Sequence, residues 1–134
     1  MSYAEKLKSP KWQKRRLEIL SRDEFKCQYC FDRETTLHVH HLEYKGNPWD
    51  AEDDQLITVC EHCHTIIGMH KKPMKVLGCI KQKVKDYIFL TMVSEFPGKK
   101  IVMIHQIERA TNEILLQHAF DSNYLILINK YMGQ

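Results

Sequence analysis

The chain has 134 residues, and its hydrophobic fraction of 43% and charged fraction of 28% are ordinary for a soluble globular protein. Its length allows one domain, or a small domain with an appendage. The longest apolar run, near residues 87–90, is too short to span a bilayer. Residues 1–16 are mostly polar and basic, unlike a signal peptide, so we expect an intracellular protein.

The net charge of +3 is unevenly distributed along the sequence. Residues 1–16 carry six Lys and Arg against one Glu, and residues 71–100 carry eight Lys against two acids. Residues 34–65, between these basic segments, carry one Lys against seven acids. Two basic flanks suit a polyanion such as a nucleic acid. Chance clustering on a solvated surface explains the charges at least as well.

The first predicted element is a helix that extends to about residue 21. Ser9 followed by Pro10 is typical of a helix start, with Ser9 as the N-cap and Pro10 in the first turn. Trp12, Ile19 and Leu20 fall on one side of this helix, and basic residues lie outside.

A strand is predicted over residues 35–42, where polar and apolar residues alternate. It carries three histidines, His38, His40 and His41. In a regular strand His38 and His40 share one face, and His41 lies on the opposite face. All three can serve one site only if the strand ends or twists here.

A turn at residues 46–48 and an acidic loop follow this strand. A second short strand is expected over residues 56–59, which leads directly into Cys60. A helix from Glu61 to about His70 completes the order strand, loop, strand, helix.

Four of the five cysteines form two Cys-x-x-Cys pairs, Cys27 with Cys30 and Cys60 with Cys63, separated by 29 residues. Disulfides are not expected in an intracellular chain, and a redox site would need only one such pair. Paired knuckles at this separation predict a tetrahedral structural zinc site. Cys79 is expected to be a small buried hydrophobic residue.

The sequence after residue 72 predicts no activity. A helical period runs through residues 76–88, although residues 87–93 could equally form a strand. Residues 107–120 also have a helical pattern, and residues 123–132 are apolar enough for a closing strand or helix.

An ordered set of motifs, W-x-x-x-R, L-x-R-D-x-x-x-C-x-x-C, H-V-H-H and L-I-T-V-C-x-x-C-H, resembles the HNH endonuclease family. Its residues are Trp12, Arg16, Leu20, Arg22, Asp23, Cys27, Cys30, His38, His40, His41, Leu56, Cys60, Cys63 and His64. The resemblance covers residues 10–70, about half of the chain. It implies an α+β fold with a ββα-metal core, an N-terminal helix and a structural zinc site, followed by a mixed α/β or helical extension.

The resemblance also implies roles for the histidines. In the family motif the general base precedes an apolar residue, here His41, and the preceding residue, His40, binds the catalytic ion. His64, after the second knuckle, is implied as a catalytic residue and a further ligand of that ion, which is Mg²⁺, Mn²⁺ or another divalent cation. A neutral imidazole can activate water at neutral pH. His38 is expected to be a polar strand residue, or else to orient a neighbour.

The sequence departs from the family pattern at the middle Asn, where Gln55 stands five residues before Cys60. In the family this Asn pins the loop through its side-chain amide. Gln55 retains that chemistry on a longer arm, and Asp54 could share the task. Gln55 is therefore included among the candidate catalytic residues.

The first functional hypothesis is a metal-dependent endonuclease that hydrolyses DNA, most simply double-stranded DNA. The alternatives are a non-catalytic zinc module that binds nucleic acid and a protein–protein adaptor. Six basic residues are candidates for phosphate contacts: Lys8, Lys11, Lys14, Arg15, Lys71 and Lys72.

The predicted organisation is a nuclease domain over residues 1–72 and an extension of unknown role over residues 73–134. The extension is a candidate dimer contact, and no membrane partner is expected. With the family in mind, the predicted location is the cytoplasm of a bacterial or phage-infected cell.

Overall fold

The computed structural model describes residues 2–44, 46–69 and 74–121. The chain divides into two compact units, unit 1 (Met1–Thr65) and unit 2 (Ile66–Gln134). Among the described residues, no helix has the length and hydrophobicity that crossing a membrane requires.

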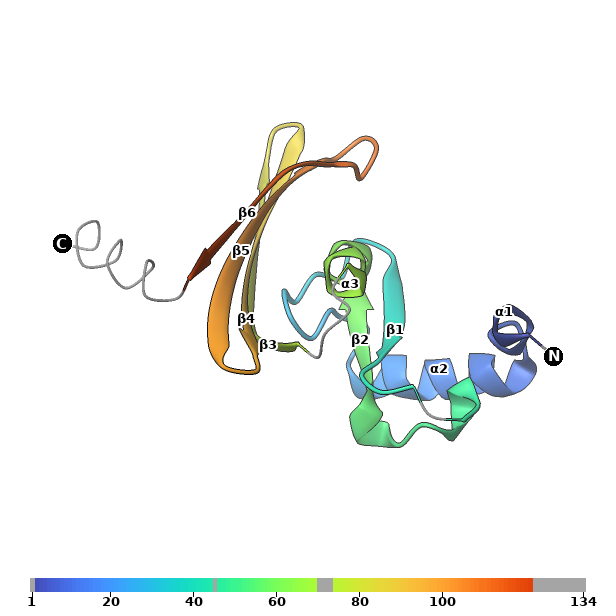
Figure 1. Ribbon diagram of the computed structural model, residues 1–134. Helices are drawn as coiled ribbons and strands as arrows, with labels where there is room; N and C mark the ends of the chain where they lie inside the picture. The colour runs from blue at the N-terminus through green and yellow to red at the C-terminus, as the bar shows by residue number, and fades with distance from the viewer. Residues whose placement is uncertain (1, 45, 70–73, 122–134) are drawn as a thin grey trace. The chain divides into compact units, whose positions relative to one another are not determined.

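Unit 1 consists of short helices and one β-hairpin (Figure 1). Its elements in chain order are α1 (Tyr3–Lys6), α2 (Pro10–Arg22), β1 (Leu37–His41), the 3₁₀ helices η1 (Pro48–Asp50) and η2 (Asp53–Gln55), β2 (Leu56–Cys60) and the start of α3 (Glu61–Gly68). The antiparallel register pairs Leu37 with Cys60 and His41 with Leu56. Each helix and strand predicted for this part of the sequence is present, within two or three residues of its predicted bounds.

Helix α2 begins where the sequence predicts. The Ser9 hydroxyl accepts a hydrogen bond from the Lys11 amide at 3.3 Å, and a proline occupies the first turn. Trp12, Ile19 and Leu20 are the buried residues of α2, which confirms the predicted apolar side.

The core of unit 1 lies between α2 and the hairpin. Trp12 and Ile19 of α2 cluster with Ala51 from the loop and Leu56 of β2, and Val39 of β1 packs against them. The apolar side of α2 therefore holds the hairpin through side chains from both strands and from the loop between them.

The Arg22–Asp23 pair joins the end of α2 to β2. Asp23 is buried and accepts the Thr58 amide hydrogen bond at 2.9 Å. Arg22 donates to both Asp23 oxygens at 2.9 and 3.0 Å, and to the carbonyls of Asp53 and Leu56 at 2.5 and 2.6 Å. Burial raises the pKa of Asp23, but the hydrogen bonds from Arg22 and Thr58 outweigh it, so the pKa is lower than its ordinary value.

Unit 2 contains a four-stranded antiparallel sheet in which sequential strands are neighbours (Figure 1). Its strands are β3 (Lys75–Val84), β4 (Tyr87–Phe96), β5 (Lys99–Glu108) and β6 (Ile114–Asp121). The turns between them contain Lys85, Gly98 and Asn112, at positive φ angles of 52°, 86° and 59°. Asn and Gly tolerate this conformation better than most residues.

Alternation along β4 explains why it is a strand. Leu90 and Met92 are fully buried, and both point to the same face because they are two residues apart. Their cross-strand neighbours His105 and Met103 in β5 are buried too. Paired residues share a face, so these four residues mark the buried face of the sheet, which includes a polar side chain at His105.

The predicted fold class is wrong. The described residues form two antiparallel sheets with six strands and only three α-helices, so the fold is β-rich and is not an α+β fold built on a ββα-metal core. The four-stranded sheet of unit 2 dominates the fold. The resemblance covers residues 10–70 and carries no information about that sheet.

The predicted helical patterns of unit 2 are also wrong. Ile80 and Val84 are four residues apart, which places them on one side of a strand as well as of a helix. Residues 107–120 are interrupted by a turn, in which the Asn112 amide donates to the Glu108 carbonyl at 2.8 Å. The prediction for residues 123–132 lies outside the described residues.

We predict that Asp23→Asn destabilises unit 1 by about 2–4 kcal/mol, because it leaves the Arg22 guanidinium without its buried counter-charge. Urea unfolding followed by tryptophan fluorescence measures this loss, since both tryptophans, Trp12 and Trp49, lie in unit 1. The matched control is Asp53→Asn, which removes an exposed carboxylate paired with Arg15 and should cost less than about 1 kcal/mol.

The pH dependence follows from the lowered pKa of Asp23. A carboxylate with a lowered folded-state pKa stabilises fully above its ordinary value of 3.8, and this contribution is lost as the pH falls through the lower folded value. Asp23→Asn should therefore flatten the acid limb of the stability curve. Equal losses in the Asp23 and Asp53 variants would contradict the role given to Asp23.

Candidate metal centre

Four cysteines meet in unit 1. The sulfur atoms of Cys27, Cys30, Cys60 and Cys63 all lie within 4.8 Å of one another, and none forms a disulfide. The Cys30 and Cys60 sulfurs are 3.6 Å apart, close to the edge of about 3.8 Å that zinc–sulfur bonds of about 2.3 Å give in a tetrahedron. The cluster is compatible with a zinc site, as the paired knuckles predicted.

The two knuckles have the same local geometry. The amide of Cys30 points at the Cys27 sulfur at 3.5 Å, and the amide of Cys63 points at the Cys60 sulfur at 3.4 Å. The Cys30 thiol lowers the pKa of Cys27 to about 6, and contacts with Cys27 and Cys30 lower the pKa of Cys60, whereas contacts with Cys27 and Cys60 raise the pKa of Cys30. The four sulfur atoms therefore compete for protons, and zinc binds such sulfurs as thiolates.

His62 lies inside the second knuckle and is not among the candidate residues named from the sequence. It is only 4% exposed. A ring nitrogen of His62, the Cys60 sulfur and an Asp32 carboxylate oxygen lie within 4.8 Å of one another. A hydrogen bond with His62 contributes to the lowered pKa of Cys60. Its position between two cysteines of a knuckle was the available signal, but only the fold brings Asp32 to it.

Three histidines form an imidazole cluster, defined here as His38, His40 and His64. The His64 ring stacks on His38, with centroids 4.7 Å apart and planes at 10°. It meets His40 edge-on, at 5.5 Å and 74°. Both β1 histidines contact His64, which confirms that His38 and His40 share a face. Two strand residues and one helix residue therefore contribute to the cluster.

The His40 ring is placed in an environment that suits a neutral imidazole. Its Nδ1 atom is buried and has no hydrogen-bond partner among the described residues. Burial, reinforced by His64 and His41, lowers the pKa of His40 to about 4, and burial also lowers the pKa of His64. Neutral imidazoles are the form that binds metals. Among the described residues, however, the groups of three or more potential metal ligands that lie close together include neither His40 nor His64.

His41 lies on the other side of β1 and is only 6% exposed. Its ring is sandwiched between Trp12 and Tyr44, at centroid distances of 4.9 and 5.2 Å. Its Nε2 is 3.0 Å from the Pro48 carbonyl, which can only accept, so Nε2 carries the proton. The structure thus brings His40 and His64 together but keeps the His41 ring apart from them.

Gln55 connects the two sides of the hairpin loop. Its amide nitrogen donates to Glu43 at 3.1 Å, and its amide oxygen accepts the Glu52 backbone N–H at 3.2 Å. Its backbone carbonyl accepts the Leu42 amide at 2.8 Å. Gln55 therefore holds the residues after β1 to the residues before β2, through hydrogen bonds in which no histidine takes part.

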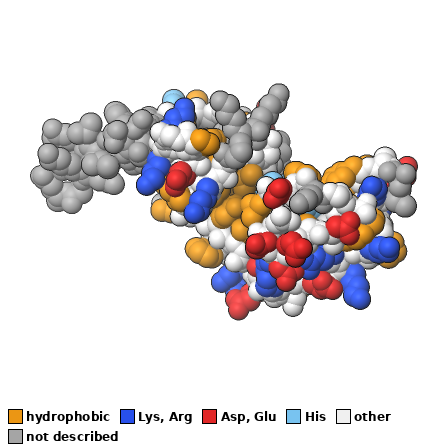
Figure 2. Space-filling model, turned by 60° about the horizontal axis from the view of Figure 1, so that its bottom comes forward, with side chains coloured by type: hydrophobic (Ala, Val, Ile, Leu, Met, Phe, Trp, Pro, Cys, Tyr) orange, Lys and Arg blue, Asp and Glu red, His pale blue; other side chains and the backbone are white. Residues whose placement is uncertain are grey.

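The candidate phosphate-binding residues fall into three groups. Lys8, Lys11 and Lys14 are exposed. Arg15 is engaged inside unit 1, where it donates to the Ala51 carbonyl at 2.9 Å and pairs with Asp53. Lys71 and Lys72 lie outside the described residues. In the lower part of Figure 2, acidic and basic side chains are interspersed.

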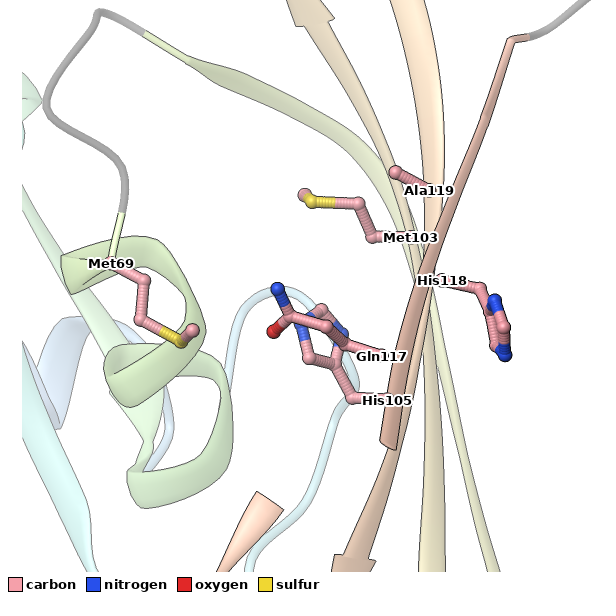
Figure 3. A pocket seen from close by; sticks show the side chains of 6 residues that line it. All are labelled: Met69, Met103, His105, Gln117, His118 and Ala119. Carbon is pink, nitrogen blue, oxygen red and sulfur yellow. The ribbon is translucent and has the colours of Figure 1, made fainter. Parts of the chain in front are cut away.

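Unit 2 contains a small pocket along β5 and β6 (Figure 3). Its lining residues are Met69, Met103, His105, Gln117, His118 and Ala119. The His118 side chain points to the opposite side of the sheet from His105 (Figure 3). Within the described part of the chain, the side-chain groups able to hold a metal all include Cys60 of unit 1. The pocket therefore adds no metal site.

Comparisons of the chain with protein-family models, with curated proteins and with solved structures found no match. The residues of unit 1 and their geometry are therefore the basis for any functional assignment.

We predict that the purified protein contains about one zinc ion per chain and that Cys60→Ser loses it and unfolds unit 1, because such sites contribute folding free energy directly. Elemental analysis and tryptophan fluorescence measure the two effects. Cys79→Ser, in β3 of unit 2, is the matched control and should retain both the metal and the unit 1 fold. A folded, zinc-free protein that tolerates Cys60→Ser would contradict this prediction.

Proposed function

We propose that the chain is a zinc-stabilised, metal-dependent endonuclease that hydrolyses phosphodiester bonds in DNA. The imidazole cluster is the observation that carries this proposal, and above all the unpartnered buried nitrogen of His40 beside His64. The resemblance to HNH endonucleases assigns the catalytic ion to these two residues. A purely structural zinc module has no need of His40, His41 and His64.

In this proposal the four cysteines hold a structural Zn²⁺. Such a closed site supplies folding free energy and no open coordination position. It joins the loop after α2 to β2 and α3. The Gln28 backbone N–H in that loop already donates a hydrogen bond to the Thr58 carbonyl of β2 at 3.0 Å. Because His64 directly follows Cys63, the structural ion also determines where the His64 ring lies.

His40 and His64 would hold the catalytic ion, which is Mg²⁺, Mn²⁺ or another divalent cation. When bound, a divalent ion stabilises the charge that develops on the phosphate and the leaving oxygen. His40 contributes a neutral ring whose pKa is far below neutral pH. His38 orients the His64 ring by stacking on it. Two imidazoles favour transition ions such as Mn²⁺ over Mg²⁺.

His41 is the proposed general base. The hydrogen bond from its Nε2 to the Pro48 carbonyl fixes the tautomer and leaves Nδ1 as the basic nitrogen. The ring is covered by Tyr44, which is itself 67% exposed. We infer that Tyr44 moves aside when DNA binds, so that His41 can reach a water molecule at the scissile phosphate.

A non-catalytic module that binds nucleic acid is the second candidate. The burial of His41 and its placement on the opposite side of β1 from His40 favour this alternative. In that case the exposed lysines would bind phosphates and the histidines would only pack. The cleavage assay below separates the two candidates.

We predict that His41→Ala lowers the single-turnover rate of plasmid cleavage by about 10²–10⁴-fold, because it removes the base. His40→Ala and His64→Ala should lose about 10–100-fold through weaker binding of the ion, and excess Mn²⁺ should partly restore them. His38→Ala should lose less, because His38 only orients His64. Zinc content and DNA affinity should be unchanged in the His41 variant.

The matched control is His118→Ala, an exposed histidine of unit 2, which should cleave at the wild-type rate. Full activity of His41→Ala would remove the assigned base. Wild-type protein that binds DNA but does not cleave it with any added divalent ion would establish the binding module instead.

We predict that replacing Lys8, Lys11 and Lys14 together by Gln weakens binding to double-stranded DNA. The slope of log affinity against log salt should fall by up to about 2.7 if each lysine contacts one phosphate. Arg15→Gln is the contrasting variant: it should lower the stability of unit 1, because Arg15 bonds within that unit. An unchanged salt slope in the triple variant would show that these lysines are only solvated.

A further inference from the structure

Asp32 and His62 come from different knuckles and meet at the sulfur atom of Cys60. Asp32 follows the first knuckle (residues 27–30), and His62 lies inside the second knuckle (residues 60–63). One ring nitrogen of His62, one carboxylate oxygen of Asp32 and the Cys60 sulfur all lie within 4.8 Å of one another. His62 and Cys60 are both buried. The motifs that resemble the HNH family include neither His62 nor Asp32.

The Asp32 carboxylate is held in place by its own segment of the chain. Its Oδ1 accepts the Glu34 backbone N–H at 2.8 Å, and its Oδ2 accepts the Thr35 hydroxyl at 2.8 Å. The Asp32 backbone carbonyl accepts the Cys27 N–H at 2.9 Å, which joins Asp32 to the first knuckle. Carboxylate oxygens have further lone pairs and can accept another hydrogen bond. A carboxylate restrained in this way is able to orient a neighbouring ring.

The charge of the zinc centre explains why a donor is useful here. Four thiolates outweigh the charge of one Zn²⁺, so the occupied centre is anionic. A buried negative charge is costly unless hydrogen bonds are donated to it. The Cys63 backbone N–H points at the Cys60 sulfur at 3.4 Å, and the His62 side chain also forms a hydrogen bond with that sulfur. A zinc-bound thiolate can only accept, so the His62 ring donates.

We propose that His62 and Asp32, here called the positioning pair, stabilise the structural zinc without binding it. The His62 N–H donates to the Cys60 thiolate, and the Asp32 carboxylate keeps the ring in that orientation. A lone pair on a nitrogen close to both groups would face two negative charges, so this nitrogen carries the proton and has no lone pair for zinc. The proposal rests on the structural zinc of the proposed function, but not on DNA binding or cleavage.

The test compares the full-length wild-type protein with His62→Phe, which retains a ring but has no donor, and with His62→Gln, which restores an N–H. Asp32→Asn removes the carboxylate charge, and the Thr35 hydroxyl can still pair with the new amide. The control is His118→Phe, at an exposed position of unit 2. Competition with a chromophoric zinc chelator measures the zinc affinity, and absorption spectra of the Co²⁺-loaded proteins report on the ligands.

His62→Phe should bind zinc about 10–100-fold more weakly, because a metal ligand loses its hydrogen-bond partner. His62→Gln should recover part of this loss, and Asp32→Asn should lose less, because Asp32 only orients the ring. In Co²⁺-loaded His62→Phe the sulfur-to-cobalt charge-transfer band should move to longer wavelength, because the Cys60 thiolate becomes richer in electrons. The d–d bands of a tetrahedral four-sulfur site should remain, because no ligand is removed. His118→Phe should match the wild type.

An unshifted charge-transfer band in His62→Phe would overturn the positioning pair even if zinc bound more weakly, because lost packing alone would explain that result. Wild-type zinc affinity would overturn it too, and altered d–d bands would make His62 a ligand instead. If His62→Phe does not fold, Asp32→Asn decides: weaker zinc binding supports the pair, and wild-type affinity overturns it.

The same measurements separate this proposal from the nuclease. A wild-type protein that binds no zinc would remove the zinc site and the positioning pair together. A zinc-loaded protein that shows the expected losses but does not cleave plasmid DNA would support the pair and contradict only the nuclease.

Discussion

The meeting of four sulfur atoms constrains everything else in unit 1. The unit has a small core between α2 and a hairpin of two five-residue strands, and small domains of this kind commonly need a metal or another cross-link to be stable. The two knuckles are separated by 29 residues, so joining them restrains most of the hairpin and its loop. Because His64 follows Cys63, the imidazole cluster depends on the same restraint.

Three charged residues of α2 and its C-terminal cap, Arg16, Arg22 and Asp23, also stabilise the arrangement of unit 1. Arg16 donates to the Leu37 carbonyl at 3.1 Å, at the first residue of β1. Arg22 and Asp23 hold β2 through backbone carbonyls and the Thr58 amide. These contacts join the helix to both strands of the hairpin. The motif residues Arg16, Arg22 and Asp23 therefore serve to join α2 to the hairpin.

The charge distribution has a similar explanation. The basic helix and the acidic loop, separate in the sequence, partly neutralise each other where Arg15 meets Asp53 and the Ala51 carbonyl. A basic residue in residues 1–16 is therefore not necessarily available to bind phosphate.

The sequence by itself determined the features that follow from local rules. The Ser9 cap, the apolar side of α2, the cysteine pairs and the shared face of His38 and His40 depend on spacing within a helix, turn or strand. Only the tertiary structure decided which polar side chains become buried. The burial of His41 and His62 could not be predicted from the sequence, because Trp12 and Asp32 reach them from distant segments.

The same limit applies to unit 2. Apolar residues four positions apart in the sequence lie on one side of a helix and also on one side of a strand, so the pattern could not distinguish the two. The turns at Lys85 and Asn112 and the pairing of β4 with β5 resolve the choice in favour of a sheet. Strand pairing is a long-range interaction, whereas the pattern of a single segment is local. For that reason the β-rich fold was decided by tertiary contacts alone.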